Sequence, residues 1–182
     1  IPALRLQDVN GDGRRDLIVV DGNYRGFHMQ RRDGSIPRDA DVELDLGIFK
    51  DTTPRGEIRP GRTLAGDDRA LLQIEDLDGD EVPDYLISHR RKLWVFHGSP
   101  AGPQFTKPTT ILRTAEDITA LLVLHLDDDG KPDLLLVRVQ VPSVGAILKG
   151  LYSKLDVEIS ATGYGGQGNR AFDRTPRWRG TV

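Results

Sequence analysis

The chain has 182 residues, of which 25 are Lys or Arg and 28 are Asp or Glu, and its net charge is −3. This length allows one domain with a sizeable core, and the scattered arginines form no basic block, so nucleic acid is not an expected partner. The absence of cysteine excludes disulfides and thiolate chemistry, and no apolar run approaches the ~18 residues that a membrane-spanning helix needs.

A nine-residue phrase occurs three times, and each copy runs into an apolar stretch. The copies cover residues 8–16, 76–84 and 125–133, called loops 1, 2 and 3 below. Each places oxygen-bearing side chains at its positions 1, 3, 5 and 9, except that His125 opens loop 3. Carboxylates this close together repel one another without a cation, and hard oxygen ligands around a turn are what calcium selects. The phrase therefore predicts a calcium-binding loop, present three times.

In chain order, the apolar stretches beside the loops are four to seven residues long and are bounded by turn residues. Such short runs favour strands over buried helices. Strands are predicted at residues 17–20, 26–31, 70–74, 85–88, 92–97, 118–124, 134–137 and 155–159. The polar stretch 38–69 is expected to form an outer strand with an extended loop.

Residues 143–155 differ from the rest because their apolar side chains recur at helical spacing after Pro142. With Ser143 as the candidate N-cap, the pattern predicts one short amphipathic helix. We expect this helix to pack against the edge of a sheet, and contact with a membrane or a partner is the alternative.

Units of three or four short strands that repeat about every 50 residues are typical of β-propeller blades. The predicted fold is all-β: a partial β-propeller of about three blades, roughly residues 1–70, 71–117 and 118–182, with one inserted helix. A propeller normally has about four to eight blades, and an open arc leaves sheet edges exposed. We therefore expect further blades from a longer protein or from another chain. The start at Ile1 and the segment 172–178, which resembles the beginning of a further repeat, agree with a truncated sequence.

The opening of loop 1, Asp8-x-Asn10-x-Asp12-Gly13, also fits the first half of an EF-hand loop. An EF-hand needs a bidentate acid at position 12 and a helix after it. Position 12 holds Val19, Ile87 or Leu136, and strand-forming residues follow. The EF-hand interpretation is therefore rejected.

The pattern Asp-x-Asp/Asn-x-Asp-Gly-x-x-Asp followed by a strand resembles the calcium loops of FG-GAP and VCBS-type repeats. Those repeats build integrin-α-like β-propellers and many secreted bacterial propellers. The segment Val95-Phe-His-Gly-Ser-Pro-Ala-Gly102 is similar to the Phe-Gly…Gly-Ala-Pro segment that names the family. The resemblance covers most of the chain, apart from about residues 38–65 and 143–170.

This resemblance implies a set of calcium ligands in each loop. In loop 1 they are the side chains of Asp8, Asn10, Asp12 and Asp16 and the backbone carbonyl of Arg14. In loop 2 they are Asp76, Asp78, Asp80 and Asp84 and the carbonyl of Val82. In loop 3 they are Asp127, Asp129 and Asp133 and the carbonyl of Lys131.

Two residues depart from the family pattern. Glu81 stands where a glycine is usual, at a turn that favours positive φ, so backbone strain is expected there. His125 replaces the first Asp of loop 3, and because nitrogen is a poor ligand for calcium, loop 3 is expected to bind most weakly. A metal-free turn is the alternative for each loop.

The sequence contains no paired metal-ligand histidines, phosphate loop or nucleophile elbow. We therefore expect a non-catalytic, calcium-stabilised propeller module that binds a protein or a glycan, or that is completed by other blades. The alternatives are part of a calcium-dependent polysaccharide lyase propeller and a purely structural component of an extracellular assembly. Loops of this charge resemble extracellular modules with affinities of about 10⁻⁴ to 10⁻³ M, which predicts an extracellular, cell-surface or periplasmic location.

Overall fold

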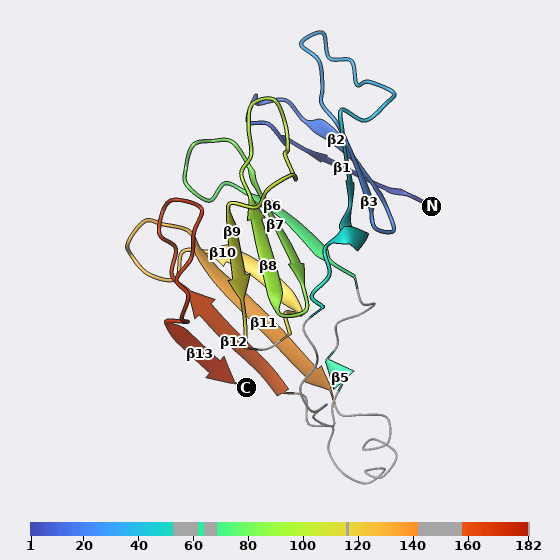
Figure 1. Cartoon of the computed structure of the whole chain (residues 1–182). Coiled ribbons are helices and arrows are strands. Elements are labelled where there is room, and N and C mark those ends of the chain that lie inside the picture. The colour runs from blue at the N-terminus through green and yellow to red at the C-terminus, as the bar shows by residue number, and fades with distance from the viewer. Residues whose placement is uncertain (53–61, 64–68, 116, 142–157, 182) are drawn as a thin grey trace.

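The computed structural model describes residues 1–52, 62–63, 69–115, 117–141 and 158–181. Three antiparallel sheets succeed one another along the chain, from the blue strands to the red ones in Figure 1. The chain thus forms three blades of a partial β-propeller, and the predicted all-β fold is confirmed. The predicted helix at 143–155 lies outside the described residues.

Each sheet is a meander in which neighbours in sequence are neighbours in space. Sheet 1 contains β1 (Ala3–Gln7), β2 (Asp16–Asp21), β3 (Tyr24–His28) and β4 (Val42–Asp45), and is followed by the short 3-10 helix η1 (Leu46–Ile48). Sheet 2 contains β6 (Leu71–Glu75), β7 (Asp84–His89), β8 (Lys92–Phe96) and β9 (Thr110–Arg113). Sheet 3 contains β10 (Ala120–Leu124), β11 (Asp133–Val141), β12 (Glu158–Tyr164) and β13 (Trp178–Thr181).

One short strand crosses between blades. β5 (Arg62–Thr63) follows sheet 1 in the chain, but it pairs antiparallel with the far end of β11 in sheet 3. In Figure 1 this pairing lies at the lower end of β11. The backbone of the first inter-blade connection is therefore tied to the third blade.

The core consists of two apolar layers, one between each pair of successive sheets. Between sheets 1 and 2, Ile18 and Phe27 pack with Tyr85, Ile87 and Phe96 in one cluster of buried residues. Between sheets 2 and 3 the buried cluster includes Leu86, Leu93, Val95, Leu121, Leu134 and Leu136. Successive residues of β7 therefore enter opposite layers, and all six of its residues are buried. This explains why β7 reads as a continuous apolar run rather than an alternating one.

Most of the predicted strands are confirmed. The stretches predicted at 17–20, 70–74, 85–88, 92–97, 118–124 and 134–137 correspond to β2, β6, β7, β8, β10 and β11. The strand predicted at 26–31 lies at 24–28, and the outer strand expected in 38–69 is β4. Of the strand predicted at 155–159, residues 158–159 belong to β12 and residues 155–157 lie outside the described part.

The interpretation of residues 172–178 as the start of a further repeat is wrong. Phe172 is buried in the layer between sheets 2 and 3, and Trp178 begins β13, which pairs with β12 as the fourth strand of sheet 3. The segment therefore belongs to the third blade, because it leads into the fourth strand of that sheet and buries Phe172 in the layer against sheet 2.

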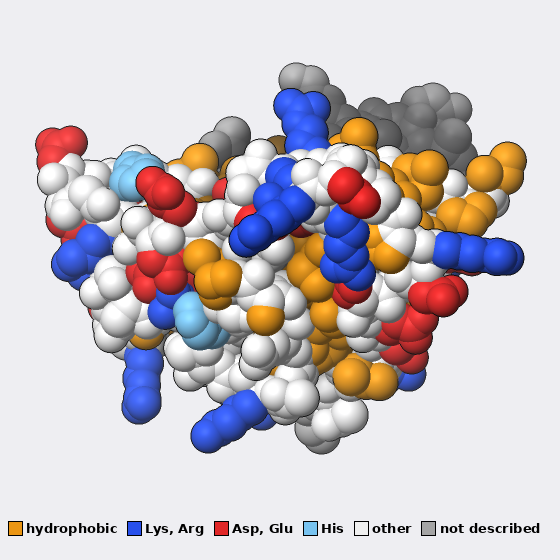
Figure 2. All heavy atoms as spheres, turned by 90° about the horizontal axis from the view of Figure 1, so that it is seen from above, with side chains coloured by type: hydrophobic (Ala, Val, Ile, Leu, Met, Phe, Trp, Pro, Cys, Tyr) orange, Lys and Arg blue, Asp and Glu red, His pale blue; other side chains and the backbone are white. Residues whose placement is uncertain are grey.

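In a four-stranded meander, the first and third connections lie at the same end of the sheet. Loops 1, 2 and 3 are the first connections of their sheets, and they lie with the β3–β4, β8–β9 and β12–β13 connections along the upper and left side of the molecule in Figure 1. Figure 2 shows this end from above, with acidic and basic side chains interspersed over it.

Candidate metal centres

The last acid of each loop is a fully buried hydrogen-bond acceptor. Asp16 begins β2, and its two carboxylate oxygens accept the N–H of Val9 at 2.9 Å and of Gln30 at 2.7 Å. The same two bonds recur at Asp84 with Leu77 and Gly98, and at Asp133 with Leu126 and Gly166. Burial raises the pKa of Asp16, while the two N–H groups act to lower it. Position 9 therefore holds each loop to the end of the third strand without a metal.

The first acid shapes the turn. Asp8 accepts the N–H groups of Asn10 and Gly11 with one oxygen and that of Gly13 with the other. Asp76 accepts the corresponding N–H groups of Asp78, Gly79 and Glu81 in loop 2. His125, at this position in loop 3, has no carboxylate to accept such bonds. Loops 1 and 2 thus share one backbone cradle that loop 3 cannot build in the same way.

Position 6 has left-handed backbone in all three loops. Its φ is 78° at Gly13, 74° at Gly130 and 66° at Glu81. The strain expected at Glu81 from the sequence is therefore present, because a residue with a β-carbon is disfavoured in this region.

The acid at position 5 of each loop accepts a hydrogen bond from the backbone of position 7. One oxygen of Asp12, Asp80 or Asp129 accepts, at 2.9 Å, the N–H of the residue two positions on, which is Arg14, Val82 or Lys131. The second oxygen of each position-5 acid contacts a cationic side chain, which is Arg14, Arg170 or Lys131. Position 7 is the residue whose carbonyl the family resemblance implies as a ligand.

Loop 2 gathers the tightest group of carboxylates. Asp76, Asp78 and Asp84 each place one oxygen within 4.8 Å of the others. Oδ1 of Asp78 is buried and has no hydrogen-bond partner among the described residues. Burial raises the pKa of Asp78, and the nearby Arg170 guanidinium opposes that change. His97 Nδ1 lies 3.3 Å from Oδ1 of Asp84 at the edge of this group.

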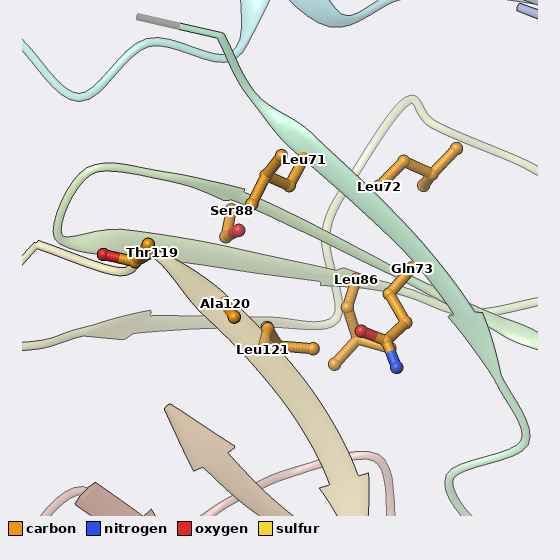
Figure 3. Close-up of a pocket in the computed structure, with 8 residues that line it drawn as sticks. All are labelled: Leu71, Leu72, Gln73, Leu86, Ser88, Thr119, Ala120 and Leu121. Atoms are coloured by element: carbon orange, nitrogen blue, oxygen red, sulfur yellow. The ribbon is translucent and has the colours of Figure 1, made fainter. Parts of the chain in front are cut away.

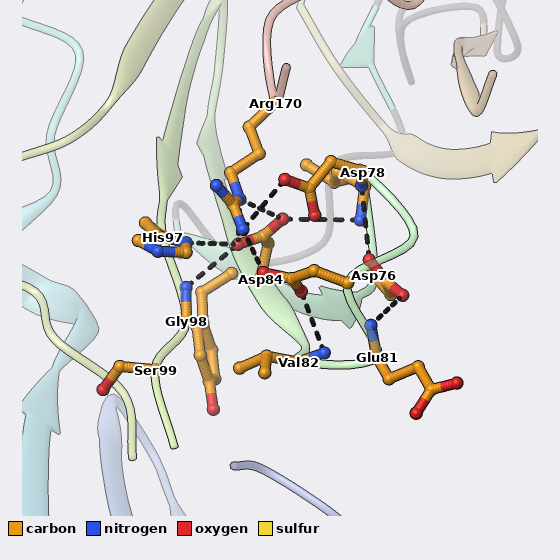
Figure 4. Close-up of polar contacts among 12 residues, drawn as sticks. Asp76, Asp78, Glu81, Val82, Asp84, His97, Gly98, Ser99 and Arg170 are labelled. Carbon is orange, nitrogen blue, oxygen red and sulfur yellow. Dashed lines mark hydrogen bonds and ion pairs between the residues drawn. The ribbon is translucent and has the colours of Figure 1, made fainter. Parts of the chain in front are cut away.

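Arg170, from the β12–β13 connection of sheet 3, inserts its guanidinium into loop 2 (Figure 4). Its Nη2 lies 2.9 Å from Oδ2 of Asp78 and 2.5 Å from Oδ2 of Asp80. Its Nε lies 3.1 Å from both oxygens of Asp84. The chain itself thus supplies a cation to three of the four aspartates of loop 2.

Cationic side chains also face the other two loops. In loop 1, Nη2 of Arg14 contacts Oδ2 of Asp12. In loop 3, Arg177 lies 3.2 Å from Oδ2 of Asp127, and Lys131 lies 3.6 Å from Oδ2 of Asp129. These contacts relieve part of the repulsion between neighbouring carboxylates. That repulsion was the reason to predict a bound cation from the sequence.

The donor set of loop 2 could hold a metal ion such as calcium, because the oxygens of Asp76, Asp78 and Asp84 converge. A carboxylate that accepts backbone N–H bonds keeps further lone pairs for a metal, and hard oxygens are the ligands that calcium prefers. The unpartnered Asp78 Oδ1 lies within the group in loop 2 that a cation would occupy. Loop 3 fits less well, because its four side-chain ligand positions hold three carboxylates and His125.

Two shallow hollows lie between the first strands of neighbouring sheets. The hollow between β6 and β10, of about 250 Å³, is lined by leucines such as Leu71, Leu86 and Leu121 with the neutral polar residues Gln73, Ser88 and Thr119 (Figure 3). The one between β1 and β6, of about 410 Å³, includes Arg5, Arg25 and Glu75 in its lining. The first hollow, whose lining residues are all described, contains no titratable side chain.

Arg170 and His97 are the site residues that sequence reasoning missed. Arg170 lies two residues after the glycine-rich stretch Tyr164–Gly168. A usable signal was the comparison of the second and third units, which places Arg170 opposite Gly102 when Gly98 is aligned with Gly166.

Residues 76–136 match the model of the FG-GAP-like repeat. The match runs from the first residue of loop 2, through β7 to β10 and loop 3, into β11. No curated protein matches the chain. Within the described residues, no helix is long and apolar enough to cross a membrane.

Proposed function

Because this chain is an FG-GAP-type repeat protein, we propose that it is a non-catalytic propeller module of a secreted or cell-surface protein, stabilised by calcium in its Asp-rich loops. FG-GAP repeats are typically non-catalytic and typical of extracellular proteins, which supports both parts of this proposal. The observation that carries the calcium part is the convergence of Asp76, Asp78 and Asp84 oxygens within 4.8 Å.

The role of the metal in this proposal is structural. Each loop joins the first two strands of a blade, and its position-9 acid already reaches the end of the third strand. A calcium ion bound to positions 1, 3, 5 and 9 would neutralise the remaining charge and hold the loop closed. Loops 1 and 2 are the proposed main sites, and loop 3 is the weakest because of His125.

The partners that we propose are a protein or glycan ligand and further blades of the same type. The outer face of sheet 1 carries Leu4 and Leu6, which are 66% and 59% exposed. They pair with Val19 and Leu17, on the face opposite to the buried Ile18. On β10 and β12 of sheet 3, Leu122, Leu124 and Ile159 are also exposed. Where two of the three sheets face each other, their apolar faces pack together. This supports a further blade as the partner of the exposed apolar faces of sheets 1 and 3.

A thermal melt in excess EDTA and in millimolar calcium tests the calcium part. Calcium at about 100 times its dissociation constant should add about 2.7 kcal/mol for each occupied loop. The expected result is a rise in Tm of several degrees with calcium and a much smaller rise with magnesium, which demands a stricter octahedral geometry.

The matched variant is Asp12→Asn, which keeps an oxygen to accept the N–H of Arg14 but removes a charge from loop 1. This variant should show a smaller calcium-induced rise than the wild type. An identical melt of the wild-type protein in EDTA and in calcium would refute calcium stabilisation.

A further inference from the structure

The β8–β9 and β12–β13 connections have the same geometry next to their own sheets. Gly98 and Gly166 each donate their N–H to the position-9 acid, and a β-carbon on either would lie 1.9 or 2.0 Å from the carbonyl oxygen of Pro83 or Pro132. Four residues further on, the second unit has Gly102 and the third has Arg170. Both have positive φ, 103° and 61°. The two connections therefore share a positive φ at this position and differ in whether a side chain is present.

Each of these connections meets the Asp-rich loop of the preceding blade. The β8–β9 connection meets loop 1 with backbone, since the carbonyl oxygen of Pro100 lies 3.4 Å from the side-chain amide of Asn10. The β12–β13 connection meets loop 2 with the Arg170 guanidinium, which contacts Asp78. The position-3 residue matches its neighbour in both cases, because the neutral Asn10 faces a carbonyl and the charged Asp78 faces a cation.

The Arg170 guanidinium is largely buried among carboxylates, as a bound metal ion would be. The Arg170 side chain is only 17% exposed, and the Asp78 and Asp84 side chains are 16% and 0% exposed. Charge pairs with this little solvent are screened weakly by salt. Arg170 contacts positions 3, 5 and 9, which are ligand positions implied for calcium by the family resemblance.

We propose that Arg170 is a tethered cation that competes with calcium for loop 2 and sets the calcium affinity of that loop. This inference rests on the proposed function, in which the Asp-rich loops bind calcium. A calcium ion on the oxygens of Asp78, Asp80 and Asp84 opposes the guanidinium, because two cations held by the same carboxylates repel each other at short range. The apparent affinity of loop 2 is therefore reduced by the fraction of molecules in which Arg170 occupies it.

The competition couples two blades. With Arg170 in place, the β12–β13 connection of sheet 3 is bound to loop 2 of sheet 2. When calcium takes the carboxylates, this contact is released. Loop 2 is thus held either by the neighbouring blade or by the metal, whereas loop 1 meets only neutral backbone at the corresponding contact through Pro100.

The experiment is a calorimetric calcium titration of the wild-type chain and of Arg170→Gly, which gives the third unit the residue that stands at Gly102 in the second. The variant should bind calcium in loop 2 at least about tenfold more tightly than the wild type. The added binding should disappear in the double variant Arg170→Gly with Asp80→Asn. Arg174→Gly is the control, because Arg174 is exposed in the same connection and its loss changes the net charge equally.

A melt in EDTA tests the tethered cation without calcium. Arg170→Gly should melt several degrees below the wild type, since three acids lose their partner, and Arg174→Gly should not. Arg170→Lys retains the charge and should lie between them, which keeps the test informative if Arg170→Gly folds only with calcium. An Arg170→Gly protein with unchanged calcium affinities would overturn the competition. If the wild-type chain bound no calcium at loop 1, the proposed function itself would be refuted instead.

Discussion

Glu81 and Gly13 hold the same left-handed backbone at position 6 of their loops, with φ of 66° and 78°. For a residue with a β-carbon this conformation costs about 1–2 kcal/mol, whereas glycine adopts it freely. The Glu81 side chain is exposed, and it was the residue that the sequence pattern marked as out of place. Loop 2 therefore carries strain that loops 1 and 3 avoid.

Glu81→Gly should raise the free energy of unfolding by about 0.5–1 kcal/mol. Glycine gives the unfolded chain more conformational entropy, which lowers stability by about 0.4–1 kcal/mol. The relief of backbone strain in the folded state is larger than this loss. Urea unfolding in EDTA measures the effect free of metal binding.

Gly13→Ala is the reverse control and should destabilise the protein by about 1 kcal/mol. A β-carbon at Gly13 meets nothing within 4 Å, so any loss there comes from the backbone alone. If Gly13→Ala were neutral and Glu81→Gly destabilising, position 6 would not be strained.

At the scale of strands and loops, Gly98 and Gly166 mark where the third strand of a blade passes closest to its Asp-rich loop. A β-carbon on Gly98 would lie 1.9 Å from the carbonyl oxygen of Pro83, and this atom belongs to backbone that cannot easily move. The N–H of Gly98 also donates to the buried Asp84. Glycine is therefore required here by close approach rather than by φ.

Gly98→Ala should destabilise the protein by about 2–3 kcal/mol or more, because the added methyl group overpacks the loop and strains the bond to Asp84. The denaturation midpoint measures this change. Gly180→Ala in β13 is the matched control, since its β-carbon meets nothing within 4 Å, and it should stay within about 0.5 kcal/mol of the wild type. Equal effects of the two substitutions would contradict the close approach.

The strands that follow the Asp-rich loops were predictable because each begins at the position-9 acid and continues in a short apolar run. β1, β9 and β13 were not predicted. β9 and β13 have only four residues each, and β1 shows the alternation of a half-buried strand at Leu4 and Leu6 rather than a continuous apolar run. The acids of the loops were visible from their spacing alone. Arg170 was not, because it lies 86 residues from Asp84 in the chain and meets it only after sheets 2 and 3 pack together.

At the scale of the whole molecule, the described residues form apolar layers on both faces of the middle sheet and on one face of each end sheet. The uncovered face of sheet 1 exposes Leu4 and Leu6 side by side on β1. Contiguous exposed apolar side chains on a sheet mark an interaction surface. This arrangement is the physical reason to expect further blades at the ends of the arc.

A second copy of the chain is the occupant to test first, because two three-bladed arcs supply a blade number within the usual range of about four to eight. Light scattering of the 20.2 kDa chain at tens of micromolar should report a mass above that of a monomer. The double variant Leu4→Lys with Leu6→Lys should be monomeric, because charge on the sheet face opposes stacking.

Ile48→Lys is the control, since Ile48 is exposed but belongs to η1 rather than to a strand of sheet 1. It should leave the association unchanged. A wild-type chain that remains monomeric at all concentrations would rule out self-association through these faces.

The pairing of β5 with β11 has a consequence for how the chain folds as it is made. Arg62 lies opposite Val141, so about eighty residues must be synthesised after β5 before its partner exists. The meander sheets need only local contacts and can form one after another as the ribosome releases them, whereas non-local pairing is slow. The first blade can therefore form early, but its link to the third must wait, and β5 is among the last elements to dock in a newly made molecule.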